Sequence, residues 1–404
     1  MAQILEREGY KVKIQVEVPA EQVERAYQSV LSEYASNVKL PGFRPGKVPA
    51  KVVESKIGRE ALMDEVKKEL RDKTFPKAAQ ELELLPVGAN VLEESLVFGQ
   101  PFVYTVAVEN YPEVKLGEWK AVELSAEAPP VTDETVAAAL EELRARNGEM
   151  VVVEREVSER DSVFIETDDG GRFPVNMENA QAHVREVLLG KRAGDEVLVP
   201  VKDGETVIRE IKTRVIEVKG LQLPELDDEF AKTVGEDSLE ALTAKVRQSL
   251  TDQFEREGRN ARASQFLDKL GEIVEAEIPP SMQSREEQSL LEQLNRDLEQ
   301  QKLDFNTYIK SLEQEGKLEE FTGELKESAT KRLRRSLAVE ALSEELKVEL
   351  SDQEFEAFLE DLARSYRTTA PRLKNELGAE AVARLRVQRL HDKALFTALD
   401  MLGK

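Results

Sequence analysis

The sequence predicts a multidomain α+β protein with an α+β head, a small β-rich module and a long all-α C-terminal part. Its 404 residues are enough for roughly two to four domains. Apolar and polar residues alternate in residues 10–18, 87–97 and 102–108, and a period of two is typical of half-buried strands. From about residue 225 the apolar residues recur at helical spacing almost to the end of the chain.

The head is predicted over residues 1–112. Its first strand ends at Pro19, and a helical stretch with one apolar face follows. A loop at residues 38–48 leads to a second helical region, 49–82, and the two later strands are joined by a turn around Gly99. This order of strand, two helical regions and hairpin predicts a compact α+β domain.

Three further segments are expected after the head. Residues 113–149 contain a linker and one helix, which begins at Thr132 or Asp133. Residues 150–224 contain four short strands, hairpin turns and one short helix, which predicts a small β-rich module. Residues 225–404 form the helical part, and breaks in its pattern are expected at Pro279-Pro280, Gly316, Ser351 and Pro371.

The composition excludes several kinds of function. The net charge of −23 argues against broad binding to nucleic acids or anionic membranes. The chain has no cysteine and only two histidines, His183 and His391, so we expect no thiolate nucleophile, no metal site and no cofactor. The N-terminus lacks the apolar region of a signal peptide, and no run of 18 apolar residues occurs. These features predict a cytoplasmic protein without a membrane span.

Residues 34–53 differ in charge from the rest of the chain. They include no acidic residue and four basic ones, Lys39, Arg44, Lys47 and Lys51. The prolines and glycines of residues 40–49 predict a tight, presented loop that is neither helix nor central strand. Phe43 lies at its centre beside basic residues, which is the composition of a binding hot spot. The alternative is an ordinary turn whose Phe43 packs back under the domain.

The segment Gly42-Phe43-Arg44-Pro45-Gly46-Lys47-Val48-Pro49 resembles the ribosome-binding signature of trigger factor, a family of bacterial nascent-chain chaperones. A second segment, residues 223–232, is similar to the sequence that follows the family's prolyl isomerase domain. The order of head, β-rich middle and helical end is also similar, so the resemblance covers nearly the whole chain.

The resemblance implies that the head docks on the large ribosomal subunit beside the polypeptide exit tunnel, on a ribosomal protein and nearby rRNA. Unfolded nascent chains are the second implied partner. The residues it assigns to ribosome binding are Gly42, Phe43, Arg44, Pro45, Gly46 and Lys47. Phe43 would fill an apolar depression, while Arg44 and Lys47 would face acidic side chains or phosphates. Such a small, charged patch makes a weak interface that salt loosens.

The resemblance also implies an FKBP-like prolyl isomerase in residues 150–224, in which an aromatic-lined pocket favours the twisted amide. Residues 160–220 contain only two aromatic residues, so we expect weak or lost catalysis. We assign no catalytic residue beyond a proline-pocket lining of Phe164, Ile165 and Phe173. His183 alone would suit a parvulin-like site, but a single histidine on a short helix is an ordinary surface or packing residue. Asp168-Asp169 precede two glycines, which favours a hairpin turn over an acid–base pair.

For the helical C-terminal part, the resemblance implies arms that cradle unfolded chains and pack with residues 113–149. Apolar groups among many charges make an adaptable client surface. The candidates for client binding are Met282, Phe305, Tyr308, Ile309, Leu312, Phe321, Phe355 and Phe358. The basic group Lys331-Arg332 and Arg334-Arg335 favours a solvated helix face. Weak self-association of the free protein would cover an exposed cradle.

Two other classes of function stay open on the sequence alone. One is a free cytosolic prolyl isomerase in which chaperoning is secondary. The other is an acidic helical scaffold that never meets ribosomes. The scaffold accounts for the charged helices, but it gives no reason for a basic loop with a presented phenylalanine.

Overall fold

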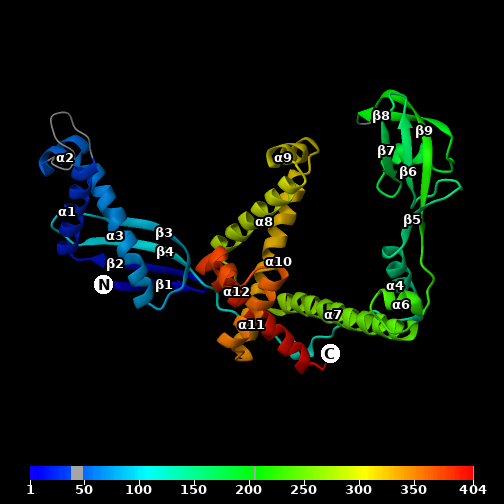
Figure 1. Ribbon diagram of the computed structural model, residues 1–404. Coiled ribbons are helices and arrows are strands. Elements are labelled where there is room, and N and C mark those ends of the chain that lie inside the picture. Colours follow the sequence, from blue (N-terminus) through cyan, green and yellow to red (C-terminus); the bar gives the residue numbers. More distant parts are fainter. Residues whose placement is uncertain (38–48, 204–205, 404) are drawn as a thin grey trace. The chain divides into compact units, whose positions relative to one another are not determined.

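The computed structural model describes residues 1–37, 49–203 and 206–403 (Figure 1). Its residues form two compact units. One unit joins Met1–Ser125 with Arg262–Lys404, and the other is Ala126–Ala261. The mixed α and β fold class, with a long helical C-terminal region, is confirmed.

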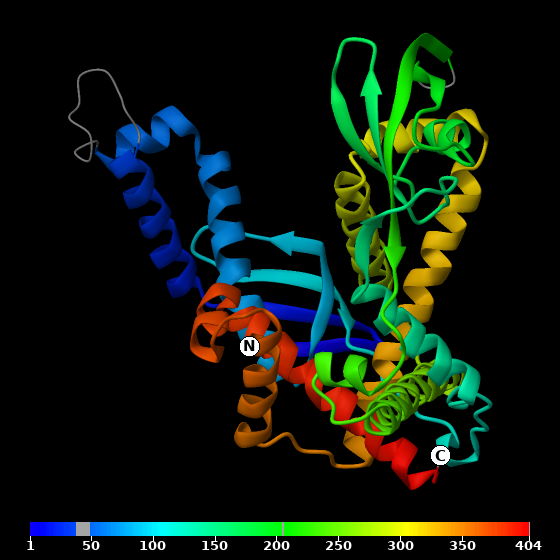
Figure 2. The same cartoon turned by 45° about the vertical axis from the view of Figure 1, so that its right-hand side comes forward.

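The head combines a four-stranded antiparallel sheet with three helices. Its elements are β1 (Ala2–Glu8), β2 (Lys11–Val18), α1 (Ala20–Asn37), α2 (Ala50–Ile57), α3 (Arg59–Glu81), β3 (Pro86–Ser95) and β4 (Phe102–Asn110). Of the three helices, α3 packs on the sheet and α2 joins α1 and α3 at the end away from it (Figure 2, blue to cyan). The sheet order is β1-β2-β4-β3. β2 and β4 pair in regular register from Lys11 opposite Glu109 to Val18 opposite Phe102, so the strands predicted there are confirmed.

The alternating pattern of β2 and β4 makes the head's core. Every second side chain of β2 points inward and is buried, and β4 adds the aromatic pair Phe102 and Tyr104. α3 covers this surface with Leu62, Val66 and Leu70. The sequence did not indicate β1, because its residues are largely exposed at the edge of the sheet and show no burial alternation.

The single helical region expected at 49–82 is two helices. Gly58 separates α2 from α3 with φ +92°, a left-handed conformation that side chains with a Cβ rarely adopt. Its backbone N–H donates to the Glu54 carbonyl at 3.0 Å and closes the end of α2. The glycine thus changes the direction of the chain without interrupting its helical character.

The C-terminal helices are interrupted at the four predicted breaks, and the structure adds two that the sequence did not indicate, one after Thr233 and one after Gln300. From residue 239 onward the helices are α7 (Leu239–Ile273), α8 (Pro280–Gln300), α9 (Phe305–Gln314), α10 (Leu318–Glu345), α11 (Asp352–Ser365) and α12 (Ala370–Met401). Pro280 begins α8, Gly316 with φ +70° separates α9 from α10, and Ser351 caps α11 through a capping box. The shared core of this part includes Trp119, whose indole N–H donates to Glu345 at 2.9 Å.

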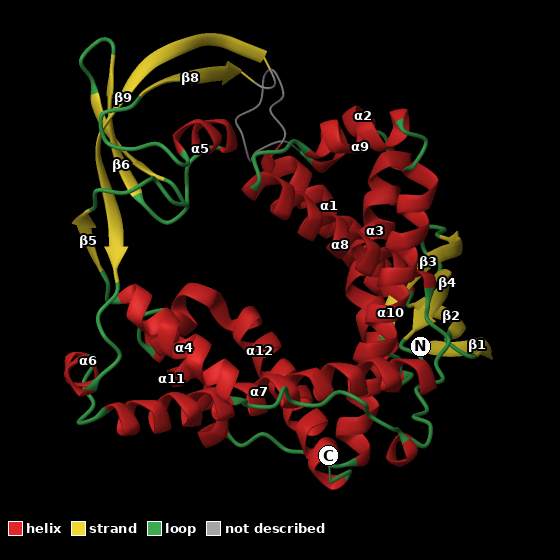
Figure 3. Cartoon of the chain, turned by 90° about the vertical axis from the view of Figure 1, so that its right-hand side faces the viewer, coloured by secondary structure: helices red, strands yellow, loops and turns green. Residues whose placement is uncertain are grey.

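The second unit contains the β-rich module, in which one short helix lies against an antiparallel sheet (Figure 3, strands in yellow). From residue 133 to residue 233 this unit consists of α4 (Asp133–Arg146), β5 (Glu149–Val152), β6 (Ser162–Thr167), β7 (Arg172–Asn176), α5 (Ala182–Leu188), β8 (Glu196–Asp203), β9 (Thr206–Gln222) and α6 (Asp228–Thr233). The strand order is β5-β9-β6-β7, and β8 also pairs with β9.

The segment 113–149 divides between two cores. Trp119 and Val122 pack on the end of α7 and on α10 and α12. Val136 and Leu140 of α4 instead pack on α6 and the first turns of α7, where Phe230 is buried. The helix start expected at Thr132 or Asp133 is confirmed, because the Thr132 hydroxyl accepts from the Thr135 N–H and caps α4.

Candidate functional site

The proposed ribosome loop lies between α1 and α2. Residues 42–47, which include Phe43 and Arg44, fall outside the described residues, so their assignment stays a prediction. The two flanking helices are described. α1 reaches Asn37, and α2 begins at Ala50 directly after Pro49.

Five of the predicted client-binding residues gather around α9. Four belong to α9 itself and one to the first turn of α10: Phe305, Tyr308, Ile309, Leu312 and Phe321. All five side chains are half-buried, and α9 has no fully buried residue. The Tyr308 and Phe321 rings meet edge to face with centroids 6.3 Å apart. Leu303, which the sequence pattern did not single out, precedes α9 by two residues and is 51% exposed. Together with Leu303 these residues form what we call the α9 surface.

The other aromatic candidates behave differently. Phe355 is buried in the core between α11 and α12, which removes it from any client-facing surface. Phe358 is half-buried and stacks near it at 6.2 Å. Guanidinium groups cover both rings, since Arg386 lies 5.3 Å from the centroid of Phe355 and Arg389 lies 5.3 Å from that of Phe358. These phenylalanines therefore hold the α11–α12 pair together.

Met282 does not join the α9 surface. It lies half-buried in the first turn of α8, whereas α9 follows the last turn of that helix (Figure 1). A helix of this length separates its ends by about 30 Å. The structure therefore brings together only part of the predicted client set.

The proposed proline-pocket residues do not share one face of the module. β6 and β7 pair with Ile165 opposite Phe173 and with Phe164 opposite Pro174. Directly opposed residues project from the same face, and neighbours along a strand project from opposite faces. Ile165 and Phe173 therefore project from the face that packs on the interior of the module. Ile165 is buried there, whereas the Phe173 side chain is 54% exposed. Phe164 lies on the other side, where the Lys219 ammonium is 5.1 Å from its ring.

The interior of the module is aliphatic among the residues that the structure describes. Its buried members are Val157, Val163, Ile165, Met177, Leu188, Val197, Val215 and Val218. The turn predicted at Asp168-Asp169 is confirmed, because the Asp169 carboxylate accepts from the Thr167 hydroxyl and from the Gly171 N–H at 3.1 Å. An acid–base role is not needed to explain these carboxylates.

A buried ion pair holds the start of the module. Asp161 is 1% exposed, and Arg155 donates to its two carboxylate oxygens at 2.6 and 2.8 Å. The Ser158 N–H adds a third bond at 2.8 Å. Burial alone would raise the pKa of Asp161, but the bonds from Arg155 and Ser158 outweigh it and hold the pKa below 3.8. The sequence did not indicate this pair, because its members are six residues apart on an irregular segment.

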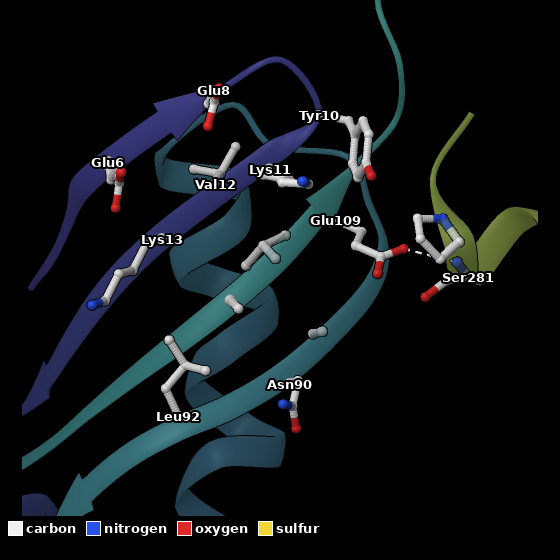
Figure 4. A pocket seen from close by; sticks show the side chains of 14 residues that line it. Glu6, Glu8, Tyr10, Lys11, Val12, Lys13, Asn90, Leu92, Glu109 and Ser281 are labelled. Carbon is white, nitrogen blue, oxygen red and sulfur yellow. Dashed lines mark hydrogen bonds between the residues drawn. The ribbon is translucent and has the colours of Figure 1, made fainter. Parts of the chain in front are cut away.

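A pocket of about 580 Å³ lies on the face of the head sheet that is turned away from α3 (Figure 4). Glu6 and Glu8 of β1 and Lys11 and Lys13 of β2 border it, and Leu92 of β3 projects into it. At one end the Glu109 carboxylate accepts from the Ser281 N–H at 2.8 Å and caps α8. The mixed charges of this pocket give no sign of a single ligand type.

The basic group on α10 is partly engaged within the helical part. Lys331 lies 3.6 Å from Asp268 of α7, and Arg332 lies 3.2 Å from Glu286 of α8. Arg335 also pairs with Asp268. These ion pairs join α10 to its neighbours, so the group is more than a solvated face.

The described residues offer neither a metal centre nor a membrane span. They contain no group of three or more acidic, histidine or cysteine side chains arranged to hold a metal ion. No helix in the described ranges is long and apolar enough to cross a membrane.

The chain is similar to known proteins along its whole length. Family models described as bacterial trigger factor protein and as its C-terminus match residues 1–143 and 238–399. A trigger factor of Thermus thermophilus is 49% identical over 404 residues, which is all of both chains. That of Deinococcus radiodurans is 34% identical and covers all of this chain and 89% of the relative.

The fold agrees with these matches. A solved trigger factor chaperone, described for its promiscuous substrate recognition in folding and assembly, superposes over 100% of both chains with a TM-score of 0.61 at 24% identity. The chain belongs to the bacterial trigger factor family of ribosome-associated chaperones.

Proposed function

We propose that this protein docks beside the exit tunnel through residues 42–47 and shields emerging chains with the α9 surface. Docking involves Phe43 in an apolar depression, with Arg44 and Lys47 facing acidic side chains or rRNA phosphates. The isomerase module is weakly active or inactive, and the protein works in the cytoplasm.

The exposure of apolar side chains on α9 is the observation that carries the client-binding part. A ten-residue helix with no buried residue has its apolar side chains only half covered by its own chain. In a monomer such a patch is unusual unless it binds something. The charged residues around it, such as Lys310 and Glu313, keep the patch wet and limit aggregation.

The distribution of charge supports docking by the head. Residues 1–112 hold 15 Lys and Arg against 17 Asp and Glu, so only −2 of the net −23 lies there. The ribosome surface is rich in phosphate, and a strongly acidic body is repelled by it at short range. The nearly neutral head with its basic loop is therefore the part that approaches most easily.

Co-sedimentation with 70S ribosomes across a salt series tests the docking. The wild type should bind and weaken as salt rises, whereas Phe43→Ala/Arg44→Ala should bind about ten-fold more weakly or worse, as for the loss of a hot spot. Arg25→Gln is the control for the lost charge, because Arg25 lies on α1 in an exposed pair with Glu21. Equal binding by the double variant and this control would contradict docking through the loop.

A free prolyl isomerase is the alternative, and it predicts catalysis. We expect the full chain to give little or no acceleration of a proline-limited refolding reaction at substoichiometric amounts. The reason is that Phe164 and Phe173 project from opposite faces of the sheet and cannot line one pocket. Acceleration that persists in Phe164→Ala and disappears in Phe173→Ala would contradict this and place a working site on the buried side.

A further inference from the structure

We propose that four head residues, Tyr27, Glu54, Arg59 and Phe98, position α1 and α2 for ribosome docking. We call them the stem clamp. The inference rests on the proposed function, because α1 and α2 are the two helices that flank residues 38–48. The clamp residues are positioning residues and need not touch the ribosome.

The clamp joins four separate elements of the head. Tyr27 of α1 meets Phe98 of the β3–β4 connection edge to face, with centroids 5.4 Å apart and planes at 71°. The Arg59 guanidinium at the start of α3 lies 5.2 Å from the Phe98 centroid. Both contacts have favourable electrostatic geometry for an aromatic ring. Phe98 thus links α1 to α3 from outside the helical layer.

Glu54 brings α2 into the same cluster. Its carboxylate lies 3.9 Å from the Arg59 guanidinium, across the left-handed Gly58 that joins α2 to α3. Gly58 at φ +92° lets the two helices meet at an angle, because the chain on either side of it is helical. The Glu54–Arg59 ion pair connects the two helices across Gly58, and the same Arg59 guanidinium also lies over the Phe98 ring. Arg59 therefore adds a polar link between α2 and the Phe98 ring to the apolar contact that the buried Val53 of α2 makes in the head core.

Two members of the cluster have environments that are uncommon in a packed core. Tyr27 is 5% exposed, and its buried hydroxyl lies near the Glu54 carboxylate without a well-aligned hydrogen bond among the described residues. Phe98 is 42% exposed although it is large and apolar. Burial, followed by the nearby Glu54 carboxylate, raises the pKa of Tyr27 above 10.0, so the phenol stays neutral. Local exceptions of this kind concentrate at functional places in a fold.

Of the four clamp residues only Tyr27 belongs to the buried core of the head. That core is closed by Ile14, Leu62 and Val66, which are all fully buried. The Arg59 and Glu54 side chains are 60% and 36% exposed, and exposed ion pairs add little to stability. Weakening the clamp should therefore change docking much more than stability.

The experiment measures the affinity of the full chain for 70S ribosomes. Arg59→Gln removes the guanidinium, and Phe98→Leu keeps an apolar side chain but removes the ring. We expect each to bind about three-fold more weakly than the Arg25→Gln control, at an unchanged melting temperature. Arg25→Gln removes the same charge from α1, where the Arg25 guanidinium pairs with the exposed Glu21. Arg59→Lys, which retains the cation, should recover part of the loss.

Three outcomes decide the proposal. Weaker binding than the control in both variants, with partial recovery by Arg59→Lys, supports it. Binding of Arg59→Gln and Phe98→Leu equal to the control, while Phe43→Ala/Arg44→Ala fails to bind, overturns the clamp and leaves loop docking intact. Full binding by Phe43→Ala/Arg44→Ala overturns the docking itself, and the clamp with it.

Discussion

Replacing Phe305, Tyr308, Ile309 and Leu312 with serine is expected to weaken client binding by about ten-fold or more and to remove most of the antiaggregation activity. These four half-buried side chains are four of the six apolar residues of the α9 surface. Losing a partly buried apolar side chain from a contact costs roughly 1 kcal/mol or more each. Light scattering of a denatured test protein diluted into equimolar full-length variant measures the effect.

The matched control places four serines on the polar side of the same helix. Asn306→Ser, Lys310→Ser, Glu313→Ser and Gln314→Ser together introduce the same number of serines and leave the net charge unchanged, because one cation and one anion are lost. Both quadruple variants lose similar helix propensity. Equal loss of activity in the two would show that helix integrity matters rather than the apolar surface. Full activity in the apolar variant would move client binding elsewhere.

Replacing Arg155 with glutamine is expected to lower the free energy of unfolding of the β-rich module by about 2–3 kcal/mol. The change leaves the Asp161 carboxylate buried without its two guanidinium bonds, and a buried carboxylate without them is costly. Hydrogen exchange of residues 150–222 in the full chain reports this stability locally. Arg192→Gln is the control, because Arg192 pairs with Glu156 at the surface with 67% and 59% of the side chains exposed. It should change exchange little.

The same pair predicts a pH dependence with a defined sign. The folded-state pKa of Asp161 is lowered from 3.8, so folding favours the carboxylate form. The stabilisation is present above the unfolded pKa and disappears as the pH falls through the lower folded pKa. The wild-type module should therefore lose protection from hydrogen exchange below about pH 4. Arg155→Gln should lose less protection on acidification, because it already lacks the stabilisation that the Arg155–Asp161 pair provides. A steeper acid loss in the variant would contradict this assignment.

Several features could be predicted because they depend on short stretches of sequence. The alternation in residues 10–18 and 102–108 identified β2 and β4, and Pro280, Gly316 and Ser351 marked helix boundaries. Helix caps, turn residues and hydrophobic periodicity involve only a few neighbouring residues, so they can be recognised from the sequence without a structure. β1 escaped prediction because an exposed edge strand carries no such period.

Other features depended on which elements pair. Whether Phe164 and Phe173 face one pocket is decided by the register of β6 and β7, and a slip of one residue would reverse the face of either side chain. Whether Phe355 is available to a client is decided by the packing of α11 on α12. These residues looked equivalent to their neighbours in sequence, because aromatic identity says nothing about what covers the ring.

The sequence by itself determined the order of head, β-rich module and helical part, the fold class, the basic loop and the family resemblance. Each of these depends on a local pattern or on a contiguous motif. Tertiary structure alone decided which face each side chain occupies, what covers it and how the stem clamp assembles. Phe98, Tyr27 and Arg59 are separated by tens of residues and meet only after the sheet and helices have packed. Contacts between distant residues depend on long-range packing, which no local period encodes.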